Sequence, residues 1–81
     1  MTDRFVLVVA GTDSSGGAGI AADLRALTAH GLRARMAITA VTAQGVSGVS
    51  RVELQSADSL RAQLVAALSL PVHAVKIGML G

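Results

Sequence analysis

The sequence has no cysteine, tryptophan or tyrosine, and its only aromatic residue is Phe5. Without cysteine the chain can form neither a disulfide bond nor a thiolate metal site. With one aromatic side chain it offers no platform on which bases could stack, and its seven basic residues are scattered along the sequence. We therefore expect no nucleic-acid partner, even though the net charge is +2.

Long apolar runs are also absent, although hydrophobic residues make up 52% of the chain. No uninterrupted run approaches the roughly 18 residues that a transmembrane helix needs. The N-terminal "MTDRF" carries charges where a signal peptide would need an apolar core. We expect no membrane partner and a cytoplasmic protein. The 81 residues suffice for one small domain, which would be marginally stable alone because it can bury little surface.

The order of the apolar segments predicts a β-α-β-α-β chain. Continuous runs rich in β-branched residues are typical of strands buried in a parallel sheet, whereas apolar residues three and four apart predict helices. Gly31 is a suitable terminator for the first helix. The expected strands are 5–10, 33–41 and 72–77. The expected helices are 18–30 and the segment between the N-cap Ser56 and Pro71. Residues 50–54 are expected to form a short exposed extension. The second helix is expected to bury Leu60, Leu64, Ala67 and Leu68.

This pattern predicts an α/β fold with a parallel sheet. Crossovers between parallel strands are right-handed, so both helices would cover the same face if the strand order ran in one direction. The other apolar face would then stay bare and need a partner. A domain that is incomplete as given would explain such a face, and also the end of the sequence directly after a strand.

Ligands of open parallel sheets bind beyond the carboxyl ends of the strands. Three segments leave those ends in the predicted fold, and all of them are rich in glycine or short polar residues. They are "GTDSSGGAG" (11–19), "TAQG" (42–45) and "GMLG" (78–81). Because the topology should bring these segments together, the sequence predicts a small-molecule site at this edge of the sheet.

The Gly-rich segment 11–19 fits neither of two common phosphate-binding motifs. A P-loop needs Lys and Ser or Thr where Gly17 and Ala18 stand. "GAGIAA" formally matches the dinucleotide fingerprint, but it begins six residues late and no acid lies between Asp23 and Glu53. Two interpretations remain open: the backbone N–H groups bind an anion or a hydroxyl, or the glycines only permit a tight connection.

Four side chains near these segments are candidates for a functional role. Asp23 flanks the apolar stripe of the first helix, where it could form an internal ion pair or bind a ligand's hydroxyl or amino group. Gln44 could read the edge of a heterocycle or simply be solvated. Met79 could form an apolar wall or pack in the core. Lys76 is expected to pair with a carboxylate, with phosphate binding as the alternative, and no residues are grouped as metal ligands.

The segments "AGTDSSGGAGIAADL", "AITAVTAQGV" and "VKIGMLG" closely resemble the N-terminal third of the hydroxymethylpyrimidine/phosphomethylpyrimidine kinases, thiamine-biosynthesis enzymes of the ribokinase-like superfamily. The resemblance implies that residues 1–81 form the substrate-binding, N-terminal portion of a ribokinase-like α/β sandwich. It also implies a homodimer at full length and the phosphorylation, with ATP and Mg²⁺, of 4-amino-5-hydroxymethyl-2-methylpyrimidine and then of its monophosphate. The implied substrate-binding residues are Gly11, Asp23, Gln44 and Met79.

The chain departs from the family pattern at three places, which bear on the orientation of the substrate. Ser14 replaces a frequent proline, Ala21 a frequent glutamine, and Gly45-Val46 a frequent Asn-Thr pair. The resemblance places the catalytic base, the anion hole and the adenine site beyond residue 81, so no catalytic residue is assigned and the isolated chain is expected to be inactive. Two alternatives remain: a fragment of a pyridoxal-type vitamin kinase, and a non-catalytic remnant or binding module.

Overall fold

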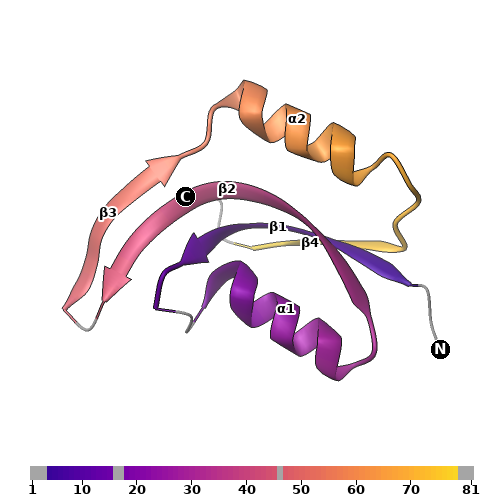
Figure 1. Ribbon diagram of the computed structural model, residues 1–81, viewed down its shortest axis with the longest axis horizontal. Coiled ribbons are helices and arrows are strands. Elements are labelled where there is room, and N and C mark those ends of the chain that lie inside the picture. Colours follow the sequence, from indigo (N-terminus) through magenta and orange to yellow (C-terminus); the bar gives the residue numbers. More distant parts are fainter. Residues whose placement is uncertain (1–3, 16–17, 46, 79–81) are drawn as a thin grey trace.

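The computed structural model describes residues 4–15, 18–45 and 47–78 of the chain. Two helices and four strands alternate in an α/β fold, as predicted (Figure 1). The elements are β1 (Phe5–Asp13), α1 (Gly19–Ala29), β2 (Arg33–Gly45), β3 (Gly48–Leu54), α2 (Ala57–Ala67) and β4 (Ala74–Ile77). The segment 50–54, expected as a short exposed extension, is part of β3, and β3 is exposed throughout.

The four strands form one sheet in the order β3-β2-β1-β4. β1 is parallel to both of its neighbours, β2 and β4, whereas β3 is antiparallel to β2. The strand order therefore reverses at β1. Both helices would share a face only if the order ran in one direction, so that condition is not met. Because right-handed crossovers that run in opposite directions place their helices on opposite sides, α1 covers one face and α2 the other (Figure 1).

The core is built around β1. Val6, Val8 and Ala10 point toward α1 and pack with Ile20 of that helix. Leu7 points to the opposite side, because side chains alternate along a strand, and it is buried as well. β1 is thus buried on both faces, as its continuous apolar sequence predicts, while the outermost strands β3 and β4 remain exposed.

β1 and β2 both run farther than predicted, past residues 10 and 41. The pairing register shifts after Ala10, and the two strands then continue to pair as far as Asp13 and Thr42. β3 holds the far end of β2 in an antiparallel hairpin. This long-range pairing outweighs the weak strand preference of glycine and polar residues, so that Gly11 and Gln44 lie in strands rather than in loops.

The predicted helix ends are largely confirmed. The Ser56 hydroxyl accepts a hydrogen bond of 3.0 Å from the N–H of Ser59 at the start of α2. Gly31 follows α1 with a φ of +73°, a value that favours glycine. The buried stripe predicted for α2 is wrong at Leu68, which is 53% exposed, whereas Ala67 is buried. α2 ends at Ala67, so Leu68 lies at the cap of the helix and not against the sheet.

Candidate functional site

A pocket of about 560 Å³ opens at the carboxyl ends of the parallel strands. Its walls come from the ends of β1, β2 and β4, from β3, and from the first two turns of α1. The volume falls in the range of small-molecule sites, about 300–1,000 Å³. Open α/β sheets bind their ligands at this edge, so the pocket lies where the sequence predicts a site.

The pocket brings together most of the candidate residues. Gly11 from β1, Asp23 from α1 and Gln44 from β2 all line it. Gly78, the first residue of the third predicted segment, lines it too, while Met79 lies outside the described residues. The predicted convergence of the three segments is therefore confirmed for the residues that the structure describes.

Gly11 lies against the first residue of α1. Gly19 has a φ of +67°, and a Cβ atom placed on it would approach the Gly11 carbonyl oxygen to 2.7 Å and the Asp13 nitrogen to 3.1 Å. Real Cβ atoms do not come this close to backbone, so only glycine lets the helix begin directly against β1. This close approach sets the position of the helix N-terminus at the rim of the pocket.

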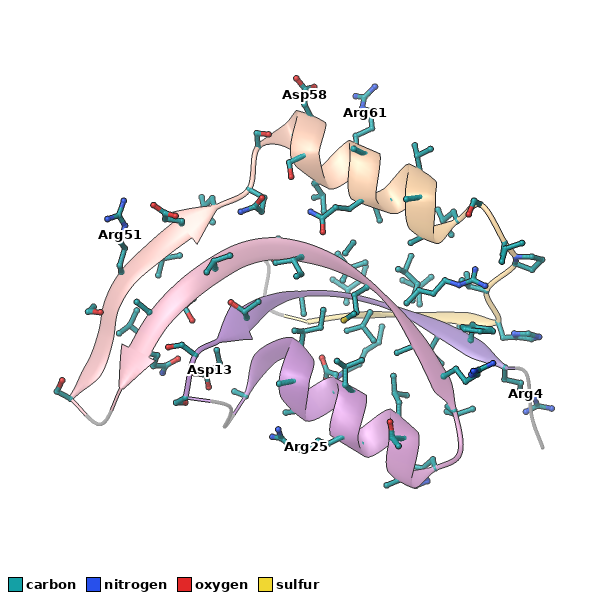
Figure 2. The ribbon with its side chains drawn as sticks, viewed as in Figure 1. Arg4, Asp13, Arg25, Arg51, Asp58 and Arg61 are labelled. Carbon is teal, nitrogen blue, oxygen red and sulfur yellow. The ribbon has the colours of Figure 1, made fainter. Side chains whose placement is uncertain are left out.

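Asp13 organises the loop between β1 and α1. One of its carboxylate oxygens accepts hydrogen bonds from the backbone N–H (2.9 Å) and the hydroxyl (2.7 Å) of Ser15, and the other accepts a bond of 2.9 Å from the N–H of Ala18. Asp13 lies at the end of β1, facing this loop (Figure 2). The sequence analysis did not assign this role, although an aspartate two residues before a turn N–H is a known turn-forming pattern.

Two hydroxyl side chains, those of Ser14 after β1 and of Thr42 in β2, tie β1 and its loop to the end of β2. The Ser14 hydroxyl donates to the Gln44 carbonyl (2.8 Å) and accepts from the Gln44 N–H (2.6 Å). The Thr42 hydroxyl donates to the carbonyl oxygen of Thr12. The Thr42–Thr12 contact reinforces the last part of the β1–β2 ladder, and the Ser14 contacts continue past its last pair, Asp13 with Thr42. They fix the backbone of Gln44 at the pocket, a role that sequence reasoning missed for Ser14.

The Gln44 side chain contributes an amide to the pocket wall. Within the described part of the chain that amide has no hydrogen-bond partner, so both its donor and its acceptor are available to a ligand. Val52 and Val49 of β3 pair with Thr42 and Gln44 and supply an apolar side of the pocket. A polar group beside an apolar surface suits the edge and the face of a flat heterocycle.

Sequence reasoning missed these two valines for a physical reason. Strict alternation along a strand would place Val49 and Val52, three residues apart, on opposite faces. The β2–β3 register shifts between Ala43 and Gln44, and such a bulge inserts an extra residue that turns both side chains to the same side. A bulge of this kind depends on the partner strand and has no signal in the sequence of β3.

Asp23 and Lys76 form an ion pair across the pocket wall. The Lys76 ammonium contacts one carboxylate oxygen of Asp23, whose side chain is only 13% exposed. The prediction that Lys76 pairs with a carboxylate is confirmed, as is the internal ion pair considered for Asp23. Since the other carboxylate oxygen also belongs to a pocket-lining side chain, the ion pair does not exclude a contact between Asp23 and a ligand.

The described residues do not fit a Mg²⁺ site. Among them no three His, Cys, Asp or Glu side chains are grouped in a way that could hold a metal ion. The two acids of the pocket are already engaged, Asp13 with the loop and Asp23 with Lys76.

No helix in the described ranges is long and apolar enough to cross a bilayer.

The four-stranded sheet with its two helices matches the N-terminal part of ribokinase-like kinases. A phosphomethylpyrimidine kinase from Clostridium difficile 630 superposes with a TM-score of 0.90 and 45% identity, over 95% of this chain and 34% of that one. A pyridoxal kinase from Bacillus subtilis, solved as an ADP complex, gives a TM-score of 0.89 and 36% identity, over 98% of this chain and 32% of that one.

The sequence narrows this class to one family. The profile of the phosphomethylpyrimidine kinase family matches residues 13–81, and the chain therefore belongs to that family. A hydroxymethylpyrimidine/phosphomethylpyrimidine kinase from Synechococcus elongatus is 52% identical over 81 residues, which cover 99% of this chain and 31% of that protein. A kinase of the same name from Rhizobium meliloti is 52% identical over 76 residues. The chain spans about a third of the length of these relatives.

Proposed function

We propose that the protein containing this chain phosphorylates 4-amino-5-hydroxymethyl-2-methylpyrimidine and then its monophosphate with ATP, as a step of thiamine biosynthesis. One observation carries the proposal. A chain of the phosphomethylpyrimidine kinase family places Gly11, Asp23 and Gln44 around one pocket at the carboxyl edge of the sheet. Relatives about half identical to it carry the name hydroxymethylpyrimidine/phosphomethylpyrimidine kinase.

In this proposal each residue has a defined role toward the pyrimidine. The Gln44 amide reads the ring edge, because it can donate to one ring position and accept from the next. A carboxylate oxygen of Asp23 accepts a hydrogen bond from the substrate's amino or hydroxyl group, and the backbone of Gly11 orients the same end. Val49 and Val52 cover a face of the ring, and Met79 remains proposed as a further apolar wall.

We propose further that residues 1–81 are the substrate-binding part of a longer kinase domain and are inactive alone. β4 is exposed along its whole length, and Val75 and Ile77 are 54% and 63% exposed. Apolar side chains on a strand with a free edge suit a sheet that continues. Mg²⁺ would be held elsewhere in that protein, because the described residues show no group of metal-ligating side chains. We propose that ATP also binds beyond these residues and that the whole protein is a cytoplasmic homodimer.

The test is substrate-dependent ADP release by the full gene product, with ATP and Mg²⁺ present. We expect kcat/KM for the hydroxymethylpyrimidine to exceed that for pyridoxal at least about tenfold, because a site that hydrogen-bonds one ring edge through the Gln44 amide discriminates strongly against a ring that lacks the matching groups. A preference for pyridoxal would instead support the alternative suggested by the pyridoxal kinase structures of similar fold. The 81-residue chain assayed in parallel should show no turnover, and turnover by it would overturn the proposed division of the domain.

A further inference from the structure

Lys76 occupies an unusual place in the sheet. It lies in β4 between Val75 and Ile77 and pairs with Val8 of β1. Residues paired across neighbouring strands point to the same face, and Val8 packs on the α1 side. The Lys76 side chain is therefore directed to the side of the sheet that carries the pocket and α1, and it lines that pocket.

Its partner Asp23 sits in a mostly apolar setting. Asp23 lies in the second turn of α1, and its side chain is 13% exposed. It lies near Gly78, which also lies close to Ala10 in the pocket wall. A carboxylate with so little contact with water needs a charged or hydrogen-bonding partner. Lys76 provides that partner, because its ammonium contacts Oδ1 of Asp23. The Lys76 side chain is 54% exposed.

The two oxygens of Asp23 consequently differ. Oδ1 is bound to Lys76, whereas Oδ2 has no hydrogen-bond donor within the described ranges. Oδ2 lies near Gly78, since a Cβ atom placed on that glycine would be 3.9 Å from it. Gly78 and Asp23 both line the pocket. The ion pair thus leaves one acceptor oxygen beside a residue without a side chain, where a ligand can reach it.

We propose that Lys76 is a positioning residue for substrate recognition: by holding Oδ1 of Asp23, it turns Oδ2 toward the ligand's N–H or O–H donor. This inference rests on the proposed function, because it assigns Asp23 a contact with the pyrimidine. In this inference Lys76 acts through Asp23, which its ammonium contacts, and not through the transferred phosphate. A Lys76 that bound the phosphate of the monophosphate would show a different kinetic pattern.

The experiment compares steady-state kinetics of the full gene product as wild type, Lys76→Met, Lys76→Arg, Asp23→Asn and the Lys76→Met/Asp23→Asn double variant. We expect Lys76→Met to raise KM for the hydroxymethylpyrimidine by about tenfold, as for one misaligned hydrogen bond to a charged group, with kcat nearly unchanged. Lys76→Arg should restore most of the affinity. The double variant should be no worse than Asp23→Asn, because residues that act as a unit are not additive.

The matched control is Arg51→Met, which removes a second ion pair, between Arg51 and Glu53. Arg51 points away from β2 on the outside of β3 (Figure 2), so its loss should leave KM unchanged. A Lys76→Met enzyme with wild-type KM, or one that loses kcat at unchanged KM, would overturn the inference. So would fully additive effects in the double variant. The wild type is measured first, since absence of pyrimidine turnover there would refute the proposed function itself.

Discussion

The side-chain amide of Gln63 in α2 binds both backbone groups of Ile38 in β2. Its Oε1 accepts from the Ile38 N–H at 2.8 Å and its Nε2 donates to the Ile38 carbonyl at 2.9 Å. Among the described residues β2 pairs with β3 from Ala40 onward, so the glutamine takes the place of a partner strand at Ile38. This contact anchors α2 on the edge of the sheet and satisfies two half-buried polar groups.

We predict that Gln63→Leu lowers the free energy of unfolding of the full gene product by about 1–3 kcal/mol, because it leaves the Ile38 N–H and carbonyl unpaired. The matched control is Gln55→Leu, since within the described part of the chain the Gln55 side chain makes a single hydrogen bond, accepted from the Ser59 hydroxyl at 3.1 Å. Urea unfolding of both variants gives the comparison. Equal losses from the two substitutions would show that the Ile38 contact has no special weight.

A second prediction concerns the close approach of α1 and β1. Gly19→Ala places a Cβ at 2.7 Å from the Gly11 carbonyl oxygen, in addition to its unfavourable positive φ. Gly31→Ala is the control, because its φ is similarly positive and nothing lies within 4 Å of the added atom. We expect Gly31→Ala to cost about 1 kcal/mol and Gly19→Ala clearly more, together with a raised KM. Equal unfolding free energies would contradict the close packing at Gly11.

Several features of the site could be predicted from the sequence because they depend on local pattern or on topology. The carboxyl ends of parallel strands lie at one edge of the sheet, which predicted that the segments carrying Gly11, Gln44 and Gly78 would converge there. The sequence predicted a carboxylate partner for Lys76 and allowed an internal ion pair for Asp23, because a charged side chain in an apolar setting requires a partner, and the structure shows that the two residues pair with each other. The N-cap Ser56 followed from the preferences of helix ends.

The rest depends on long-range pairing that no local pattern encodes. The position of β4 beside β1 reverses the strand order and separates the two helices, and a β-α-β-α-β pattern is compatible with either order. The bulge opposite Gln44 turns Val49 and Val52 into the pocket. Ser14 reaches Gln44 from 30 residues away, and a serine in a Gly-rich loop gives no indication of a partner at that distance.

That long-range contact leads to a third prediction. Ser14→Ala removes both hydrogen bonds that fix the Gln44 backbone, so we expect KM for the pyrimidine to rise severalfold while kcat changes little. Ser50→Ala serves as control, because the Ser50 hydroxyl makes a single bond of 3.1 Å to the Ala43 carbonyl on the same strand pair. If the two alanine variants have the same KM, Ser14 does not orient Gln44.

The last prediction tests the amide of Gln44 directly. Gln44→Leu keeps a branched side chain, one atom shorter than that of glutamine, and removes its donor and acceptor. A site that hydrogen-bonds its ligand loses far more discrimination than a purely apolar one when a polar group is removed. We therefore expect kcat/KM for the hydroxymethylpyrimidine to fall by about 10²-fold or more, and the preference over pyridoxal to narrow. Unfolding of this variant should match that of the wild type, because the amide has no partner among the described residues. A variant that keeps both its turnover and its preference would show that Gln44 does not read the ring, and recognition would then have to come from Asp23 and the backbone of Gly11.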